Sequence, residues 1–316
     1  MKRRGKNLRK SPGFLISIFL LFCMLEVLWG PVCIFPLREV SKTILLDIRL
    51  PRMLMVVLAG FSLSLSGATL QGMFRNPLVS PYLLGVASGA AFGASLGFLF
   101  SFPYPLIALL SFTFSLLAVF AALSISRSPL TLLLAGIAVS SFFSSLTSIL
   151  QFLMTKEKLS GVVFWIMGGF SRVSMKAVWL TLPAVFLSSL FILLSSWRVD
   201  ILSLPEDETL SLGVDPVKIR AVFVILCSLC VSSAVCFTGP IGWIGLIAPH
   251  IARILSGPSH RRLIPASMLL GGSLLLLADI VSRLPSGVEV PTGVVTALAG
   301  APFLIFLLRR KRWDLR

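Results

Sequence analysis

The stretch GPIGWIGLIAPHIAR, residues 239–253, lies between two long apolar segments and carries three glycines, two prolines and a histidine. Gly239, Gly242 and Gly245 recur at every third residue, a spacing that lets a neighbouring helix approach closely. Pro240 and Pro249 remove backbone donors, which a membrane tolerates only where protein or a water-filled cavity satisfies the freed carbonyls. We therefore expect Gly239, Pro240 and Gly242 to line a protein-enclosed path, with a kinked packing helix as the alternative.

The rest of the chain has the composition of a membrane protein. Of its 316 residues, 56% are hydrophobic and 13% are charged, and the mean hydropathy is +0.98. These values lie outside the range of soluble globular domains. The 28 Lys and Arg residues, against 12 Asp and Glu, are spread between apolar runs and the termini. This spread argues against a nucleic-acid partner and is typical of basic residues retained on the cytoplasmic side of a membrane.

Cutting the sequence at prolines, glycines and charges gives ten candidate membrane helices. A spanning helix needs about 20 apolar residues. The first candidate follows a basic segment but is too long for the core of a signal peptide, so we expect it to be retained. The spans are 14–35, 53–73, 82–101, 105–125, 130–153, 177–197, 219–238, 242–256, 264–283 and 292–309. The sequence thus predicts an all-α integral membrane protein, with residues 1–316 as a single transmembrane domain.

The distribution of basic residues predicts the orientation. An even number of spans puts both termini on one side, and both termini are basic. Placing them in the cytoplasm puts 19 Lys and Arg inside and 9 outside, as the positive-inside rule requires. We expect a multi-pass protein of the cytoplasmic (inner) membrane with both termini in the cytoplasm.

The longest polar stretch away from the termini, residues 198–218, falls on the predicted cytoplasmic side. Pro205 is followed by three acidic residues at 206–208, which is typical of the start of a helix, and Gly213 is a plausible end. A short helix lying on this face would suit a soluble partner. An ordinary solvated loop is the alternative.

Two segments resemble each other weakly and suggest an internal repeat. SGATLQGMFRNPLVSPYLLG (66–85) and SSAVCFTGPIGWIGLIAP (232–249) both end a helix rich in small residues at a break that contains proline. In the predicted topology the first break faces the cytoplasm and the second the exterior. Spans two to five and seven to ten would then form an inverted repeat.

Few ionisable residues lie within the candidate spans, where charge is costly. Asp279 precedes Arg283 by four residues, so the two can pair on one helix face; a proton relay is the alternative. Glu26 has no evident partner in the sequence, which leaves contact with another subunit as one explanation. Cys227 and Cys230 have CxxC spacing but no further ligands nearby, and we expect them to be packing residues.

The sequence lacks the motifs of enzyme chemistry. GxSxG, HExxH and GxxxxGK[ST] do not occur, so no nucleophile elbow, zinc helix or phosphate loop is predicted. We expect no catalytic residue, cofactor site or metal site in this chain. Any coupling to ATP would require a second protein.

Eight motifs resemble the permease subunits of ABC importers for iron-siderophores, haem and cobalamin, the FecCD-type transport family, some members of which carry molybdate or tungstate. They follow the family order from about residue 45 to 308. The motifs are RLPR (49–52), SGATLQGMFRNPLVSPYLLGVASGA (66–90), LLLAGIAVS (132–140), FWIMGGF (164–170), LSLGV (210–214), GPIGWIGLIAPHIAR (239–253), ADIVSRL (278–284) and EVPTGVVTALAGAPFLIFLL (289–308).

The resemblance implies a type II ABC importer permease with ten helices per subunit. Two copies would form a homodimer around a central path. Two cytoplasmic ATPase subunits would hold ATP and Mg, and an extracytoplasmic substrate-binding protein would deliver the cargo. The loop between spans six and seven would seat in the ATPase through Leu204, Pro205, Glu206, Asp207, Leu210, Leu212, Gly213 and Val214.

The resemblance also implies that arginines at the outer face dock the binding protein. The matching residues are Arg49, Arg52 and Arg283. A guanidinium group suits carboxylate docking, and exposed charges mainly speed the encounter. For Arg49 and Arg52, anchoring of a helix at the membrane interface is the alternative.

In family members the fifth span, here about 130–153, lines the translocation path. Its hydroxyl groups make it unusually polar for a spanning helix, and no residue in it is a strong metal or carboxylate ligand. Such a wall would pass a bulky cargo without holding it. The expected lining residues are Ser140, Ser144, Thr147, Ser148 and Gln151, of which the last four share a helix face by their spacing.

Two functions remain open. The first is an importer permease that moves an iron-siderophore, haem, cobalamin or related cargo by alternating access. The second is an ion-coupled secondary transporter that works without an ATPase. That function needs intramembrane carboxylates, and only Glu26 and Asp279 are available. The cargo stays open, because selectivity is expected to reside in the binding protein.

Overall fold

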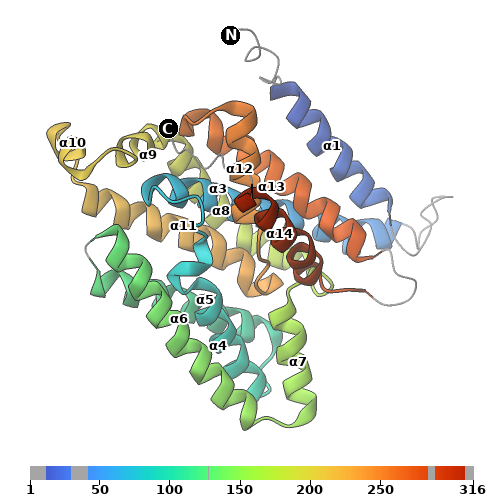
Figure 1. Cartoon of the computed structure of the whole chain (residues 1–316). Helices are drawn as coiled ribbons and strands as arrows, with labels where there is room; N and C mark the ends of the chain where they lie inside the picture. The colour runs from blue at the N-terminus through green and yellow to red at the C-terminus, as the bar shows by residue number, and fades with distance from the viewer. Residues whose placement is uncertain (1–11, 30–41, 127, 284–288, 310–316) are drawn as a thin grey trace.

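The computed structural model describes residues 12–29, 42–126, 128–283 and 289–309, and every regular element in these ranges is helical (Figure 1). The longer helices are α1 (Pro12–Leu28), α3 (Leu50–Met73), α4 (Val86–Leu99), α5 (Tyr104–Ile125), α6 (Pro129–Phe152), α8 (Met175–Leu194), α11 (Pro216–Thr238), α12 (Ile244–Ser256), α13 (His260–Ser282) and α14 (Thr292–Arg309). The shorter elements are η1 (Ile44–Arg49), η2 (Pro81–Leu84), α7 (Lys156–Met167), α9 (Ser196–Leu202) and α10 (Glu206–Ser211).

The ten longer helices correspond to the ten predicted spans. Within the described ranges, six helical segments are long and apolar enough to cross a membrane, and four shorter apolar helices accompany them. The first helix ends at Leu28, and residues 30–35 of its predicted span lie outside the described part of the chain. The prediction of an all-α membrane protein with about ten spans is confirmed.

The second span begins earlier than predicted. A π-helical turn, η1, runs directly into α3, so one helical segment extends over Ile44–Met73. Pro51 does not stop it, because proline in the first turn of an α-helix costs no hydrogen bond. The RLPR motif is therefore helical, and its arginines project from helix walls rather than from a loop.

Helix α3 forms the centre of the molecule and packs against α13, α11 and α12. Glycines allow these helices to approach closely. A Cβ atom on Gly67 would lie 1.9 Å from the carbonyl oxygen of Gly245, and one on Gly60 would lie 2.8 Å from that of Gly271. Small residues at such crossings are typical of membrane helices, where close packing rather than the hydrophobic effect drives association.

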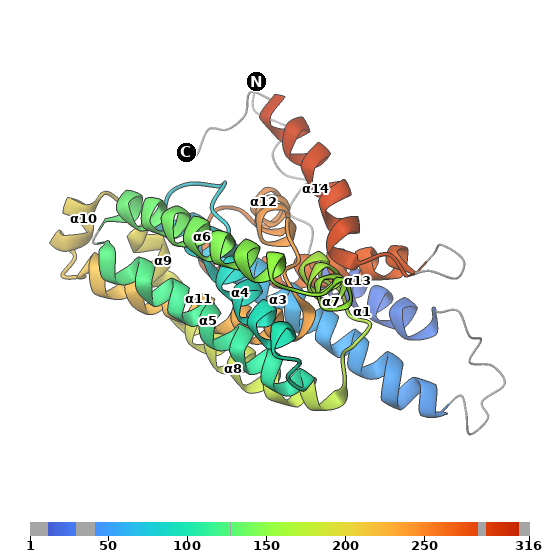
Figure 2. The same ribbon diagram turned by 90° about the horizontal axis from the view of Figure 1, so that it is seen from below.

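The helix pairing supports the inverted repeat. Helices α3 to α6 pair among themselves as α11 to α14 do: α4 packs on α5 and α6, as α12 packs on α13 and α14. Across the halves, α3 packs on α13 and α11 packs on α5. The two halves run in opposite directions, because α3 ends where α11 begins, beside α9 and α10 (Figure 2).

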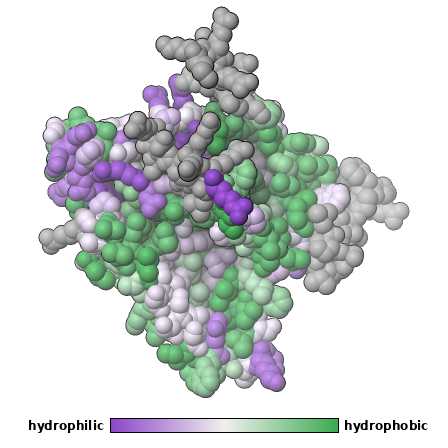
Figure 3. Space-filling view, viewed as in Figure 1, coloured by the Kyte–Doolittle hydropathy of each residue, from purple (hydrophilic) through white to green (hydrophobic). Residues whose placement is uncertain are grey.

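The molecule has two ends that differ in polarity. Helices α9 and α10 lie at one end of the long helices α5, α6, α8 and α11 (Figure 2), and hydrophilic residues gather there in the space-filling view (Figure 3). We call this the α10 end. Over much of the remaining visible surface the residues are hydrophobic, as expected of faces that contact lipid or another subunit. The opposite end, where α13 leads to α14, is called the network end.

Candidate functional site

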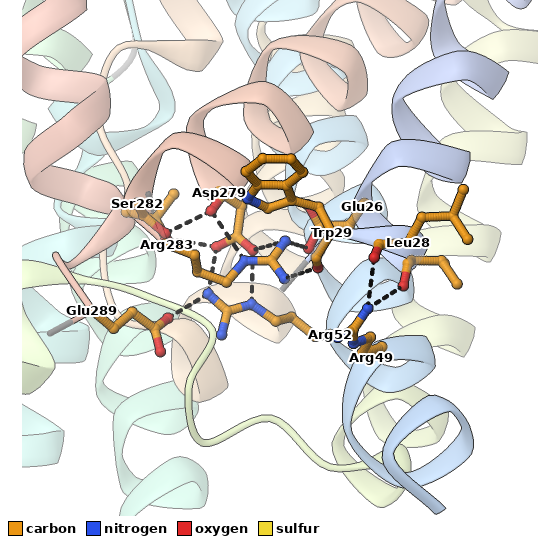
Figure 4. Close-up of polar contacts among 11 residues, drawn as sticks. Glu26, Leu28, Trp29, Arg49, Arg52, Asp279, Ser282, Arg283 and Glu289 are labelled. Carbon is orange, nitrogen blue, oxygen red and sulfur yellow. Dashed lines mark hydrogen bonds and ion pairs between the residues drawn. The ribbon is translucent and has the colours of Figure 1, made fainter. Parts of the chain in front are cut away.

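A buried ion-pair network joins α1, α3 and α13 at the network end (Figure 4). At its centre the Arg52 guanidinium donates from Nε to Oδ2 of Asp279 (2.7 Å) and from Nη2 to Oδ1 (3.0 Å). Thr292 Oγ1 donates to the same Oδ1 (2.8 Å), and Arg52 also pairs with Glu289. Both carboxylate oxygens of the fully buried Asp279 are therefore satisfied.

The network extends to the end of α1. Arg283 pairs with Glu26, donates to the carbonyl oxygen of Trp29 (3.0 Å) and lies 3.5 Å from Asp279 Oδ2. Arg49 donates from Nη1 to the carbonyl oxygens of Val27 and Leu28, both at 2.9 Å. These arginines satisfy carbonyls that the end of a helix leaves free. We define the ion-pair network as Glu26, Arg52, Asp279, Arg283 and Glu289.

This geometry corrects the expectation that Arg49, Arg52 and Arg283 form an exposed rim. All three side chains are buried and engaged within the chain, Arg52 and Arg283 by acidic groups of other helices and Arg49 by carbonyl oxygens of α1. Pairing of Asp279 with Arg283 is confirmed, although Arg52 is the closer partner of Asp279. Glu26 also has a partner within the chain, so it needs no second subunit.

A cavity of about 190 Å³ opens beside the network. Glu289 is 35% exposed and belongs both to the network and to the wall of this cavity. The remaining wall includes four aromatic side chains and one exposed cation, Arg172. The lining residues are Tyr104, Phe164, Trp165, Gly168, Gly169, Ser171, Arg172, Phe237, Thr238, Glu289 and Pro291.

The break at residues 239–243 is held by hydrogen bonds within the chain. The Tyr82 hydroxyl donates to the carbonyl oxygen of Ile241 (3.0 Å) and accepts from its N–H (2.9 Å). Gly169 N–H donates to Thr238 O (2.8 Å). Tyr82 thus satisfies backbone groups that the break leaves free, as a membrane interior requires.

Gly239, Gly242 and Gly245 do not form the predicted stripe along one helix. Only Gly245 lies in a helix against a neighbour, at the crossing with α3. Gly239 has φ +68° and packs against the Trp165 carbonyl, whereas Gly242 faces open space beside a second cavity of about 200 Å³. Pro240 contacts the backbone around Gly168. The stripe prediction is wrong because residues 239–243 are not helical.

The predicted path residues on α6 are not all exposed. Ser144 and Ser148 are exposed, whereas Thr147 is buried and donates to the Phe143 carbonyl (2.8 Å). Ser140 and Gln151 are half-buried. Ser141, Ser144, Ser145 and Ser148 instead form the exposed hydroxyl face of α6, since a helical turn of 3.6 residues carries position 147 away from position 141.

The polar loop carries two helices rather than one. The predicted helix after Pro205 is α10, and Gly213 follows it with φ +74°. The preceding α9 was not predicted, because the predicted span 177–197 extended into its first residues, Ser196 and Trp197. Thr209 Oγ1 donates to the Ile201 carbonyl (3.2 Å) and joins the two helices into one unit. Leu210 and Leu212 are exposed on it, at 57% and 58%.

Other predicted coupling residues have different surroundings. Leu204 and Val214 are half-buried, while Pro205, Asp207 and Gly213 are exposed. Glu206 pairs with the buried Arg220 of α11 at 2.8 Å. Sequence reasoning missed Arg220, Glu289 and Tyr82. The last two lie in the motifs EVPTG and SPYLLG, but only the fold shows which distant groups they meet.

The arrangement leaves neither intramembrane carboxylate free. Asp279 and Glu26 are both paired with arginines, so the two groups that an ion-coupled carrier would need are already neutralised. Within the described ranges no group of three His, Cys, Asp or Glu residues is placed to hold a metal ion. The geometry offers a network end held by buried ion pairs, an exposed hydroxyl face on α6 and a hydrophilic α10 end with exposed leucines.

Comparison with known proteins agrees with this geometry. The molybdate import system permease protein MolB of Haemophilus influenzae is 40% identical over 295 residues, which cover 90% of this chain and 87% of that protein. The vitamin B12 import system permease protein BtuC of Klebsiella pneumoniae is 39% identical over 273 residues, covering 84% of this chain and 82% of the relative.

A solved structure shows the same fold. It is described as an inward-facing conformation of a metal-chelate type ABC transporter, with a TM-score of 0.90 and 36% sequence identity. The match covers 95% of this chain and 100% of the solved chain. The model of the FecCD transport family matches residues 13–310. The chain therefore belongs to the FecCD transport family.

Proposed function

We propose that this chain is the transmembrane permease subunit of an ATP-binding-cassette importer. Two copies form a homodimer in the cytoplasmic membrane, with both termini and the α10 end in the cytoplasm. Two ATPase subunits bind ATP and Mg and grip the α10 end. A substrate-binding protein delivers the cargo to the network end. ATP binding and hydrolysis then drive alternating access, and the chain itself is not an enzyme.

The observation that carries this proposal is a pair of exposed leucines at the end of α10. Leu210 and Leu212 are more than half exposed, yet they lie beside the acidic residues 206–208 at the hydrophilic end of the molecule. Lipid does not cover such a site, since the neighbouring carboxylates need water. Apolar side chains on a polar surface are typical of a protein contact. An ATPase groove with an apolar floor and basic rim fits them.

The exposed hydroxyl face of α6 supports a path between the two subunits. Ser141, Ser145 and Ser148 each donate back to the carbonyl four residues earlier, at 3.0, 3.0 and 3.1 Å. Their protons are thus occupied within the helix, and the face offers only weak acceptors to a passing molecule. We propose that cargo slides along this face without a fixed binding site.

The cargo class follows from the relatives. They are described as permeases for molybdate and vitamin B12 and as a metal-chelate transporter. These molecules differ in size and charge, although the permeases share one scaffold. We propose a metal chelate such as an iron-siderophore, haem or cobalamin, or a related oxyanion, selected by the binding protein rather than by this chain.

Docking of the binding protein on the arginines requires an exchange of partners. Arg52 is buried, but its partner Glu289 is 35% exposed at the cavity. We propose that a carboxylate of the binding protein enters there and takes the place of Glu289 on Arg52. Arg49 and Arg283 then act by holding α1 against the docking face.

The test is co-purification of this chain with its proposed ATPase subunits. Leu210→Glu with Leu212→Glu should abolish the complex, because two charges would be buried against an apolar floor. Leu153→Glu is the matched control: Leu153 is 62% exposed at the far end of α6, and its variant should keep the complex. Full recovery of the ATPase with the double variant would contradict the proposed grip.

A further inference from the structure

Helices α9, α13 and α3 meet at one histidine. His260 is the first residue of α13 and is buried. Its Nδ1 lies 2.6 Å from Oδ1 of Asp200 in α9, and its backbone N–H donates to the same oxygen at 3.0 Å. Ser259 Oγ donates to Oδ2 at 3.4 Å. Because a carboxylate only accepts, the Nδ1 atom carries the proton.

The imidazole ring also fits against the end of α3. A Cβ atom on Gly72 would lie 2.2 Å from His260 Nε2 and 2.6 Å from Cε1, so only glycine leaves room for the ring. Ser203 Oγ, just after α9, donates to the Gly72 carbonyl at 3.3 Å. His260 Nε2 has no hydrogen-bond partner among the described residues. The ring is thus held by α9 through Nδ1 alone.

Among the ion pairs of the described residues, one more connects the α9–α10 unit to the rest of the chain. Glu206 of α10 pairs with Arg220 of α11. Both carboxylates of the unit are partly exposed, Asp200 at 41% and Glu206 at 45%. The unit therefore has ion pairs at two points, one on α11 and one on α13, while the buried Val199 and Leu202 of α9 pack in the core. Water reaches the carboxylate of each pair, although Arg220 and the His260 ring are themselves buried.

Electrostatics favour the contact in its present form. Burial acts to raise the pKa of Asp200, but the hydrogen bonds from His260 and Ser259 outweigh it and lower the pKa below its ordinary value. The carboxylate is thus charged at neutral pH and available to hold the ring.

The two helices that receive this contact lead to the other end of the molecule. Helix α13 runs without interruption from His260 to Ser282, and α3 packs along it. Asp279 and Arg52, near their far ends, are joined in the ion-pair network. A displacement entering at His260 would thus move one continuous pair of helices, rather than a chain of loosely packed side chains.

We propose that Asp200 and His260 are positioning residues of the transport cycle, which transmit movement of the α9–α10 unit to α13 and α3. This inference rests on the proposed function, in which an ATPase grips that unit. It assigns the pair a role in coupling rather than in contact with the cargo or nucleotide. By the same argument, the Glu206–Arg220 pair transmits movement of the α9–α10 unit to α11.

Two substitutions of His260 test whether its hydrogen bond to Asp200 is needed or whether any polar side chain at this position suffices. Asparagine places an amide nitrogen where histidine has Nδ1, whereas glutamine places it nearer to Nε2. His260→Asn should therefore keep the bond to Asp200, and His260→Gln should lose it. Asp200→Ala removes the acceptor. Lys218→Ala, which breaks the exposed pair with Asp215 at the same end, is the control.

The readout is a pair of distances in the full complex with its ATPase. Spin labels at Trp197 on α9, which is 51% exposed, and separately at Leu277 on α13, report distances between the two subunits with and without ATP and vanadate. In the wild type, His260→Asn and Lys218→Ala, both distances should shift. In His260→Gln and Asp200→Ala, the shift at position 197 should remain while most of the shift at position 277 is lost.

The outcomes separate the two proposals. Failure of the wild type to assemble with the ATPase would remove the proposed function itself. Assembly with an unchanged shift at position 277 in His260→Gln would overturn only the role of the pair. A wild type in which position 197 shifts and position 277 does not would overturn it equally. Thermal midpoints of the variants show whether any of them fails to fold.

Discussion

The two ends of this permease are fastened in different ways. At the network end, two acids and two arginines are buried together and bridge α1, α3 and α13, and Glu289 joins them from the cavity wall. At the α10 end, each carboxylate that holds the α9–α10 unit is partly in water. Breaking a pair at the network end leaves both of its charges without water, whereas at the α10 end the carboxylate keeps its water and only its partner is buried. We therefore expect the α10 end to be displaced more easily than the network end.

The largest expected effect on stability comes from breaking the ion-pair network. Asp279→Asn would leave Arg52 with Glu289 and Arg283 with Glu26, and should cost about 3–5 kcal/mol of stability. The measurement is thermal unfolding in detergent, followed by a thiol-reactive dye, since Cys227 and Cys230 are buried in the folded chain. Asp215→Ala, which removes the N-cap of α11 and an exposed pair with Lys218, should cost about 1 kcal/mol. Equal costs would abolish the contrast between the ends.

A pair of glycines tests the same contrast in the backbone. Gly239 at the network end and Gly213 at the α10 end both have positive φ, +68° and +74°. A Cβ atom on Gly239 would lie 2.1 Å from the Trp165 carbonyl, but on Gly213 it would meet nothing within 4 Å. Gly213→Ala should cost about 1–2 kcal/mol for the backbone alone. Gly239→Ala should cost at least about 1–3 kcal/mol more, for the overlap.

A smaller effect, on binding of the substrate-binding protein, is expected at Glu289, where the ion-pair network reaches the surface. Glu289→Gln would weaken the hold on Arg52 without removing Asp279 from it. Binding of the substrate-binding protein to the reconstituted complex should then tighten several-fold, and more at low salt than at high salt. Lys176→Gln, an exposed charge elsewhere on that side of the chain, should weaken binding slightly or leave it unchanged. Weaker binding by Glu289→Gln would show that Glu289 is itself a docking group.

The smallest effect is a dependence on pH at the α10 end. The pKa of Asp200 is lowered by its hydrogen bonds to His260 and Ser259. Its contribution is therefore present above the unfolded pKa of about 3.9 and is lost as the pH falls through the lower folded value. Fluorescence of Trp197 on α9 should change below about pH 4 in the wild type. The same change in Asp200→Ala would contradict this assignment of the contact.

The sequence predicted the spans well because hydrophobicity and length are local properties. The ten segments, the acidic start of α10 and the Asp279–Arg283 pair all depend on residues close together in the chain. Family resemblance supplied the class of protein. These features needed no knowledge of which helices meet.

The site was predicted less well because it depends on long-range contacts. Arg52 reaches Asp279 across 227 residues and Glu289 across 237, so its burial is invisible in the sequence. The spacing on α6 placed Thr147 beside Ser144, but it did not show that neighbouring helices bury Thr147 and leave Ser144 exposed. The glycine stripe failed because spacing alone does not tell a helix from a break.

The most direct test of the account is cargo uptake by proteoliposomes that contain this chain, its ATPase and its binding protein. Molybdate, ferric dicitrate and cobalamin, each radiolabelled, serve as probes. We predict uptake that requires ATP and that disappears with the Leu210→Glu and Leu212→Glu double variant. Uptake at full rate in nucleotide-free vesicles, or undiminished uptake by that variant, would contradict the claim that the α10 end is where the transporter is driven.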